Sequence, residues 1–122
     1  MGLDMFVFST KEKIPDVDFE GDIAHREELA YWRKHPNLHG WMENLYRAKG
    51  GEAEIFNCVA VKLDSHDIDL LEEALAENSL PETTGFFFGV SDGYHDEQTK
   101  EFIVKARDAI AKGNNIFYTS WW

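Results

Sequence analysis

The sequence predicts an α+β fold in which one mixed β-sheet is packed with about four helices. Short apolar runs bounded by turn residues recur at both ends and in the middle of the chain, which is typical of strands. Between them, apolar residues recur at helical spacing, which indicates amphipathic helices. The chain has 122 residues, of which 43% are hydrophobic and 14% aromatic, so we expect a single α+β domain over residues 1–122 with its own core.

The first two expected elements are a strand and a helix. Residues 3–9 (LDMFVFS) form an apolar run almost at the start of the chain, and we expect this strand to lie inside the sheet. Residues 23–34 then show a helical pattern in which Leu29 and Trp32 face inward and the charged side chains face solvent.

A second helix is expected after a tight corner. Pro36 disfavours helical geometry at His35, and Asn37 is a good residue to cap the helix that follows. Gly50 and Gly51 end this helix. Its apolar stripe has the i, i+3, i+4, i+7, i+8 spacing and consists of Leu38, Trp41, Met42, Leu45 and Tyr46.

The second half of the chain is predicted to alternate strands and helices. Residues 54–63 (EIFNCVAVKL) are the most strand-like run, and we expect the thiol of Cys58 to be buried there. The remaining expected elements are a helix capped by Asp64 or Ser65, a buried strand over 86–90 (FFFGV), a helix over 96–112 and a strand over 115–122. The predicted order is therefore β-α-α-β-α-β-α-β.

The charge balance limits the partners of the chain. There are 23 Asp and Glu against 12 Lys and Arg, for a net charge of −11, and no basic residue lies between Lys62 and Lys100. Such a field repels nucleic-acid phosphates and anionic lipid headgroups, so we expect neither nucleic acid nor a membrane as a direct partner. An acidic surface of this kind is usually solvated, but it also suits a basic partner or imitates a nucleic acid.

The compartment is predicted from the cysteine count and the first residues. A single cysteine cannot form an internal disulfide, and the start MGLDMFVFS lacks the basic region and the long apolar core of a secretory signal. We therefore expect a soluble protein in a reducing, intracellular compartment.

The stretch over residues 30–41 (AYWRKHPNLHGW) concentrates side chains that both pack and do chemistry. We expect a ligand-binding site, if there is one, to draw on this stretch and on the C-terminal aromatics. The candidate site residues are Trp32, Arg33, Asn37, His39, Tyr118 and Trp121. Packing is the competing role for each of them, and for Arg33 we expect a fork onto a carboxylate such as Asp4.

The chain ends in two tryptophans that would point to opposite faces of a strand. One of them should join the core. The other, if exposed, is a good interface anchor, so a homodimer is a reasonable expectation.

No catalytic residue, metal site or cofactor is predicted. His35 and His39 have the spacing of a helical pair of metal ligands, but Pro36 lies between them. Ser91 lies in a Gly-x-Ser-x-Gly pattern, yet a chain of 122 residues is short for a hydrolase of that class, and a turn explains the same residues. No glycine-rich phosphate-binding motif is found.

The start MGLDMF, the run ELAYWRKHPNLHGW and the ending YTSWW resemble a family of small bacteriophage and prophage proteins. Members of that family begin MGLDMY, carry an AYWRK–N–H–W core and end in an aromatic strand near SSW. The resemblance implies an accessory protein that acts inside a bacterial host, and it implies no catalytic residue. The positions it marks as shared are Asp4, Tyr31, Trp32, Arg33, Asn37, His39, Trp41 and Trp121.

Three functional hypotheses follow. The first is a non-enzymatic binding protein with an unknown protein or small-ligand partner. The second is a ligand-binding domain or enzyme, which requires Arg33 and His39 to converge on a pocket. The third is an acidic inhibitor of a host nucleic-acid-binding protein, which requires the Asp and Glu residues to gather on one face.

Overall fold

The chain folds into a four-stranded β-sheet with three helices in the part that the structure describes. This structure is a computed structural model, and it describes residues 2–19, 25–83 and 93–122. The elements in chain order are β1 (Asp4–Thr10), β2 (Arg26–Arg33), α1 (Pro36–Ala48), β3 (Ala60–Leu63), α2 (Ser65–Ala76), α3 (Gly93–Ala111) and β4 (Asn115–Trp121). The α+β class is as predicted.

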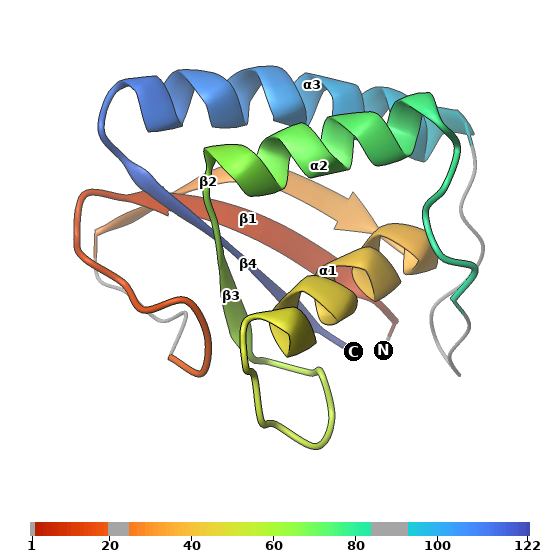
Figure 1. Ribbon diagram of the computed structural model, residues 1–122, viewed down its shortest axis with the longest axis horizontal. Helices are drawn as coiled ribbons and strands as arrows, with labels where there is room; N and C mark the ends of the chain where they lie inside the picture. The colour runs from red at the N-terminus through yellow and green to blue at the C-terminus, as the bar shows by residue number, and fades with distance from the viewer. Residues whose placement is uncertain (1, 20–24, 84–92) are drawn as a thin grey trace.

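The sheet has the strand order β2-β1-β4-β3, and every pairing among these strands is antiparallel. The expectation of a mixed sheet is therefore wrong for the described residues. The first strand lies inside the sheet, as predicted, because β2 and β4 both pair with it. The two ends of the chain consequently lie close together in Figure 1, where Asp4 is the register partner of Trp121.

All three helices cover the same face of the sheet (Figure 1). Successive side chains of a strand point to opposite faces of the sheet, so every second side chain of β1 and β4 faces the helices, while the others face away. Met5 and Val7 of β1 and Ile116 and Tyr118 of β4 enter the main core in this way. Trp32, Leu38, Leu71 and Phe102 reach the same core from β2 and the three helices.

The other face of the sheet, which we call the open face, is covered in one part by the chain itself. Phe8, Ala60 and Phe117 form a second cluster there, and Ile14 and Phe19 pack against it from the segment after β1. Arg26 lies over the Phe8 ring, with its guanidinium carbon 4.1 Å from the ring centroid.

The prediction of a helix over residues 23–34 is wrong, because this segment contains the edge strand β2. A bulge hides the two-residue period in the sequence: Val7 pairs with Ala30 and Phe8 pairs with Glu28, so Leu29 is the extra residue. Helix-forming glutamates at positions 27 and 28 do not prevent pairing, since the exposed edge of β1 offers a complete row of backbone partners. The charged, mostly exposed β2 suits an edge strand.

The strand expected over residues 54–63 is much shorter, since β3 covers only its last four residues. Cys58 lies before β3, is exposed and has a φ of 60°. The expectation of a buried strand thiol is therefore wrong. The strand expected over 86–90 lies outside the described residues.

The helices begin and end within a few residues of the expected positions, but the expectation that Asn37 caps α1 is wrong. The N-cap of α1 is His35, and the Asn37 side chain instead accepts from the backbone N–H of Thr83. Asp64 caps α2 through a reciprocal capping box with Asp67, and the Asp67 carboxylate also pairs with Lys49 at 2.6 Å. Pro36 stands at the first turn of α1, where its missing N–H costs nothing. Gly113 follows α3 with a φ of 85°, a conformation that glycine adopts without strain. Within the described ranges, none of the helices has both the length and the apolar character that crossing a membrane requires.

Candidate binding site

The six residues expected to form a site do not share one pocket. Trp32, His39 and Tyr118 are buried on the helix side of the sheet. Arg33 and Trp121 are exposed on the open face, and Asn37 lies in the first turn of α1. Arg33 and His39 therefore do not converge, because they lie on opposite sides of the sheet.

His39 is part of an aromatic cluster in the core. Its Nδ1 atom lies 2.6 Å from the hydroxyl of Tyr118, and its ring packs against Phe56 at a centroid distance of 5.0 Å. Burial lowers the pKa of His39 to about 4, although a hydrogen bond to the Phe56 backbone acts in the opposite direction. Burial likewise raises the pKa of Tyr118 well above its usual value. Both side chains are therefore neutral near pH 7, and their geometry is that of a core contact.

Trp32 is also a core residue. Its indole N–H donates to the hydroxyl of Thr99 at 3.1 Å, and its ring meets Phe102 edge-on at 5.1 Å. Asn37 accepts a hydrogen bond from the backbone N–H of Thr83 at 3.1 Å, so it connects α1 to the segment after α2. Trp32 and Asn37 therefore both have structural roles in the fold.

Arg33 forms the expected contact with Asp4. The guanidinium donates to Oδ1 of Asp4 at 3.0 Å, and the Tyr31 hydroxyl donates to the same oxygen at 2.6 Å. The hydrogen bond to Asp4 raises the pKa of Tyr31. The pair connects β2 to β1, whereas the sequence predicted a contact between a strand and a helix.

The two C-terminal tryptophans behave as expected. Trp121 is 69% exposed on the open face, while Trp122 turns inward and packs against the main core. The indole N–H of Trp122 donates to the carbonyl of Phe56 at 3.0 Å.

The histidine pair considered as metal ligands is divided between two environments. The His35 ring stacks on His95 of α3 at 4.6 Å, while the His39 ring lies beside Phe56 and Tyr118. No cluster of three potential metal-ligating side chains occurs in residues 2–19, 25–83 and 93–122. Ser91 lies outside these ranges.

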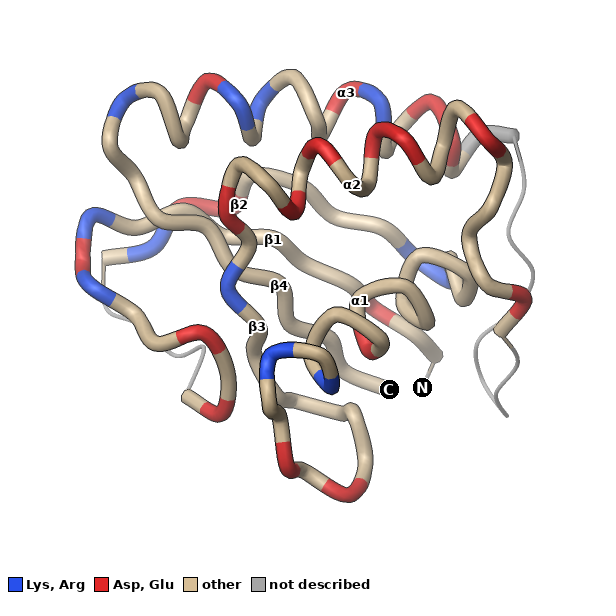
Figure 2. Tube along the Cα trace, in the orientation of Figure 1, with Lys and Arg blue, Asp and Glu red and all other residues tan. Residues whose placement is uncertain are grey.

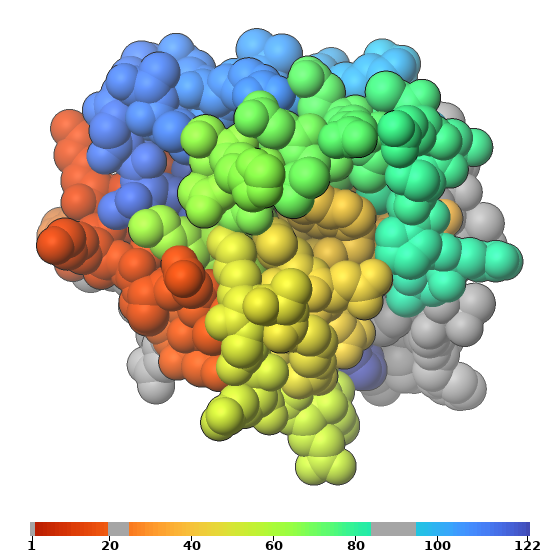
Figure 3. Space-filling model, viewed as in Figure 1, coloured from red at the N-terminus to blue at the C-terminus, as the bar shows by residue number. Residues whose placement is uncertain are grey.

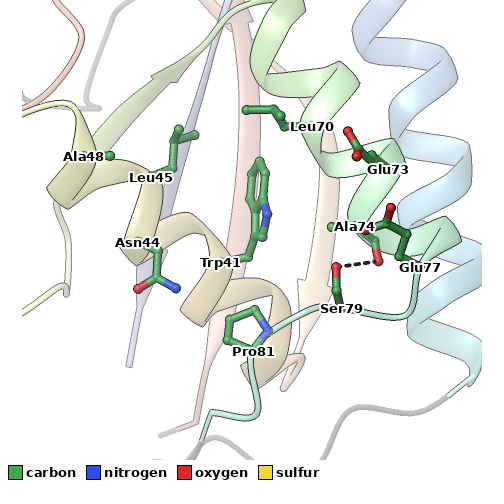
Figure 4. Close-up of a pocket in the computed structure, with 10 residues that line it drawn as sticks. All are labelled: Trp41, Asn44, Leu45, Ala48, Leu70, Glu73, Ala74, Glu77, Ser79 and Pro81. Atoms are coloured by element: carbon green, nitrogen blue, oxygen red, sulfur yellow. Dashed lines mark hydrogen bonds between the residues drawn. The ribbon is translucent and has the colours of Figure 1, made fainter.

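A groove between α1 and α2 is a better candidate. It has a volume of about 490 Å³, within the range of ordinary binding pockets, roughly 300–1,000 Å³. Figure 4 shows the Trp41 ring standing between the two helices, with Leu45 beside it on α1 and Leu70 facing it from α2. The residues that line this α1–α2 groove are Trp41, Asn44, Leu45, Ala48, Leu70, Glu73, Ala74, Glu77, Ser79 and Pro81.

The groove combines an apolar floor with an acidic wall. Trp41 is half-buried and Leu70 is 40% exposed, so both offer apolar surface to a partner. Figure 4 places Glu73 and Glu77 on the α2 side of the same groove. Neither carboxylate forms an ion pair within the described ranges, whereas Arg107 of α3 pairs with Asp69 and Glu72 on the other side of α2.

The helices α2 and α3 differ in the charges that they carry. Figure 2 shows acidic residues along α2, while α3 carries both signs. Figure 3 shows the helical surface, on which the residues of α1 (yellow) lie directly below those of α2 (green). Between α1 and α2, Asp67 pairs with Lys49 at the end of α1, whereas Glu73 and Glu77 form no ion pair among the described residues.

Sequence reasoning missed the groove because it assigned Trp41 entirely to the core. One signal was present, since Leu70 lies beside the buried stripe of α2 rather than on it. The separation of α1 and α2 depends on how both pack on the sheet, and the sequence pattern does not contain that information.

Comparison with known proteins finds no matching family, curated protein or solved structure. The function is therefore inferred from the chain's own geometry and chemistry.

Proposed function

We propose that this chain is a non-enzymatic binding protein that holds a basic, amphipathic segment of a partner protein in its α1–α2 groove. The observation that carries the proposal is Trp41, half-buried between two helices. An exposed leucine and two carboxylates without an ion-pair partner among the described residues lie around it. Tryptophan at the centre of a concave surface is a common anchor of protein interfaces.

The floor of the groove supplies the affinity in this proposal. Burying apolar surface against Trp41, Leu45 and Leu70 stabilises a complex by about 25 cal/mol per Å² removed from water. An amphipathic helix fits such a floor, because its apolar side chains recur every three to four residues along one face.

The wall of the groove supplies orientation and partner choice. Lysine or arginine beside the apolar stripe of the partner would pair with Glu73 and Glu77. The net charge of −11 attracts a basic segment from a distance and repels acidic ones.

The place of action is proposed from the resemblance to phage and prophage proteins. That likeness supports an accessory protein in the cytoplasm of a bacterial host, with a host protein as the partner. It also favours binding over catalysis, since the family likeness brings no catalytic residue.

Titration with a designed peptide tests the proposal. The probe is an amphipathic helix of about 18 residues with leucines on one face and lysines on the other, and the control replaces every lysine by glutamate. We expect saturable binding of the lysine peptide alone, with NMR shift changes confined to the groove residues. Binding of both peptides alike, or shifts located elsewhere, would contradict the proposal.

Two variants sharpen this test. Trp41→Ala should weaken binding by about tenfold or more, because it removes the anchor. Val104→Ala is the matched control, because Val104 is 70% exposed on α3 and does not line the groove. Equal affinity of the Trp41 variant and the wild type would overturn the assignment of the groove.

The acidic α2 also favours a second candidate, an inhibitor that imitates nucleic acid. The exposed carboxylates of this helix are Asp69, Glu72 and Glu73, and Glu77 is exposed directly after its last residue. The two functions differ in their dependence on Trp41. A purely electrostatic mimic would tolerate Trp41→Ala, whereas a groove-binding protein would not.

A further inference from the structure

The open face of the sheet carries a second, separate apolar surface. It consists of Phe6, Tyr31 and Trp121 together with the charged pair Asp4 and Arg33, and we call these five residues the open-face patch. Tyr31 is 40% exposed and Trp121 is 69% exposed, so two large aromatic side chains meet solvent on the two strands that flank β1. None of the five lines the α1–α2 groove.

The register of the sheet brings these residues together. Phe6 is paired with Tyr31 on one side, and Asp4 is paired with Arg33 on one side and Trp121 on the other. The Phe6 and Tyr31 rings lie 5.2 Å apart. Asp4 Oδ1 accepts hydrogen bonds from both Tyr31 and Arg33, so the polar rim of the patch is held in place.

The same face is covered at its other end. Ile14 and Phe19 pack against the Phe8–Phe117 cluster there, and Phe19 meets the Phe117 ring at 5.3 Å. The aromatic surface thus continues along the face, from a part that the chain buries to a part in which Trp121 is exposed. If another surface covered the exposed part, it would bury aromatic side chains, as Ile14 and Phe19 do at the other end of the face.

We propose that the open-face patch is the interface of a symmetric homodimer, in which the patches of two copies pack against each other. A two-fold interface needs a patch that is complementary to itself. The open-face patch meets this requirement, because it holds one carboxylate and one guanidinium around an aromatic centre. Rotation about a two-fold axis brings Arg33 of one copy toward Asp4 of the other.

The charge of the rest of the chain restricts where two copies can meet. Each copy carries −11, so surfaces such as α2 repel each other. Asp4 and Arg33 cancel within the patch, which makes it a surface that two acidic copies can bring together. Added salt should strengthen the dimer, because it screens the long-range repulsion between the copies.

Sedimentation equilibrium of the purified chain tests the proposal. We expect the wild type to dimerise with a dissociation constant in the range of about 1–100 µM, and to do so more tightly at higher salt. A wild-type chain that stays monomeric up to roughly ten times that range overturns the proposal.

Matched variants locate the interface. Trp121→Ser should give a monomer, whereas Val104→Ser should dimerise as the wild type does, although the two residues are exposed to the same extent, 69% and 70%. Arg33→Glu places like charges across the two-fold axis and should also give a monomer. Circular dichroism of each variant establishes that the fold is kept. A Trp121→Ser chain that still dimerises overturns this assignment and leaves the groove proposal unaffected. A dimer that only Trp41→Ala dissociates would place the second copy in the α1–α2 groove and overturn both proposals.

Discussion

The Nδ1 atom of His39 lies 2.6 Å from the hydroxyl of Tyr118, and both side chains are closed to solvent. The ring also has a hydrogen bond to the Phe56 backbone, so its polar atoms are satisfied inside the core. This pair connects α1 to the central strand β4.

Lowering the pH should destabilise the fold through His39. Its pKa is about 4 in the folded chain against 6.5 ordinarily, so the unfolded chain binds the proton more readily. The contribution of the neutral ring is complete above pH 6.5 and is lost as the pH falls toward 4, by about 3 kcal/mol in total. Urea unfolding at several pH values measures this loss. His39→Gln is the reference, and an identical pH dependence in the two chains would contradict the prediction.

Removing the Tyr118 hydroxyl should cost about 1–3 kcal/mol of stability, because Nδ1 of His39 then loses its buried hydrogen-bond partner. Tyr31→Phe is the matched control, since it removes a hydroxyl that is hydrogen-bonded to Asp4 near the surface. We expect a loss below about 1 kcal/mol for that variant. Denaturant unfolding of both compares the two directly, and equal losses would show that the burial of Tyr118 does not matter.

The ion pair between Lys49 and Asp67 should be the most sensitive of the described ion pairs to single substitution. The two side chains are only 14% and 5% exposed, and Asp67 also takes part in the capping box of α2. Lys49→Met leaves that carboxylate buried without its cation and should cost about 3–5 kcal/mol. Lys112→Met is the control, since both Lys112 and its partner Asp108 are exposed and we expect almost no change in stability. Thermal melting distinguishes the two outcomes.

Arg33→Ala should leave the stability of the monomer almost unchanged. The Arg33 side chain is 52% exposed, so solvent screens its attraction to Asp4. A melting temperature lowered by more than roughly 5 °C at a concentration where the chain is monomeric would contradict this and would assign Arg33 to the framework of the fold.

Local signals in the sequence were sufficient for most of the framework. The apolar runs gave β1 and β4, and capping residues and stripes gave α1, α2 and α3 to within a few residues. The strand β2 was missed because the bulge at Leu29 interrupts its alternation and because its edge position leaves most of it exposed. Pairing with β1 is a long-range interaction that no local pattern around residue 26 reveals.

The site was predicted less well than the fold. Four of the six candidate residues take part in packing contacts, which the sequence analysis had named as the competing role. The exposure of Trp121 was anticipated from strand alternation. The α1–α2 groove was not, because the space between two helices depends on how far apart the sheet holds them.

A charge-reversal experiment tests the central proposal, the basic occupant of the α1–α2 groove, most directly. The double variant Glu73→Lys/Glu77→Lys is titrated with the lysine peptide and with its glutamate counterpart by calorimetry. We predict that the affinity of the variant for the lysine peptide is lower than that of the wild type by about tenfold or more. We also predict that the variant gains measurable affinity for the glutamate peptide. Retention of the lysine peptide at wild-type affinity would contradict the account, because the acidic wall would then have no part in choosing the partner.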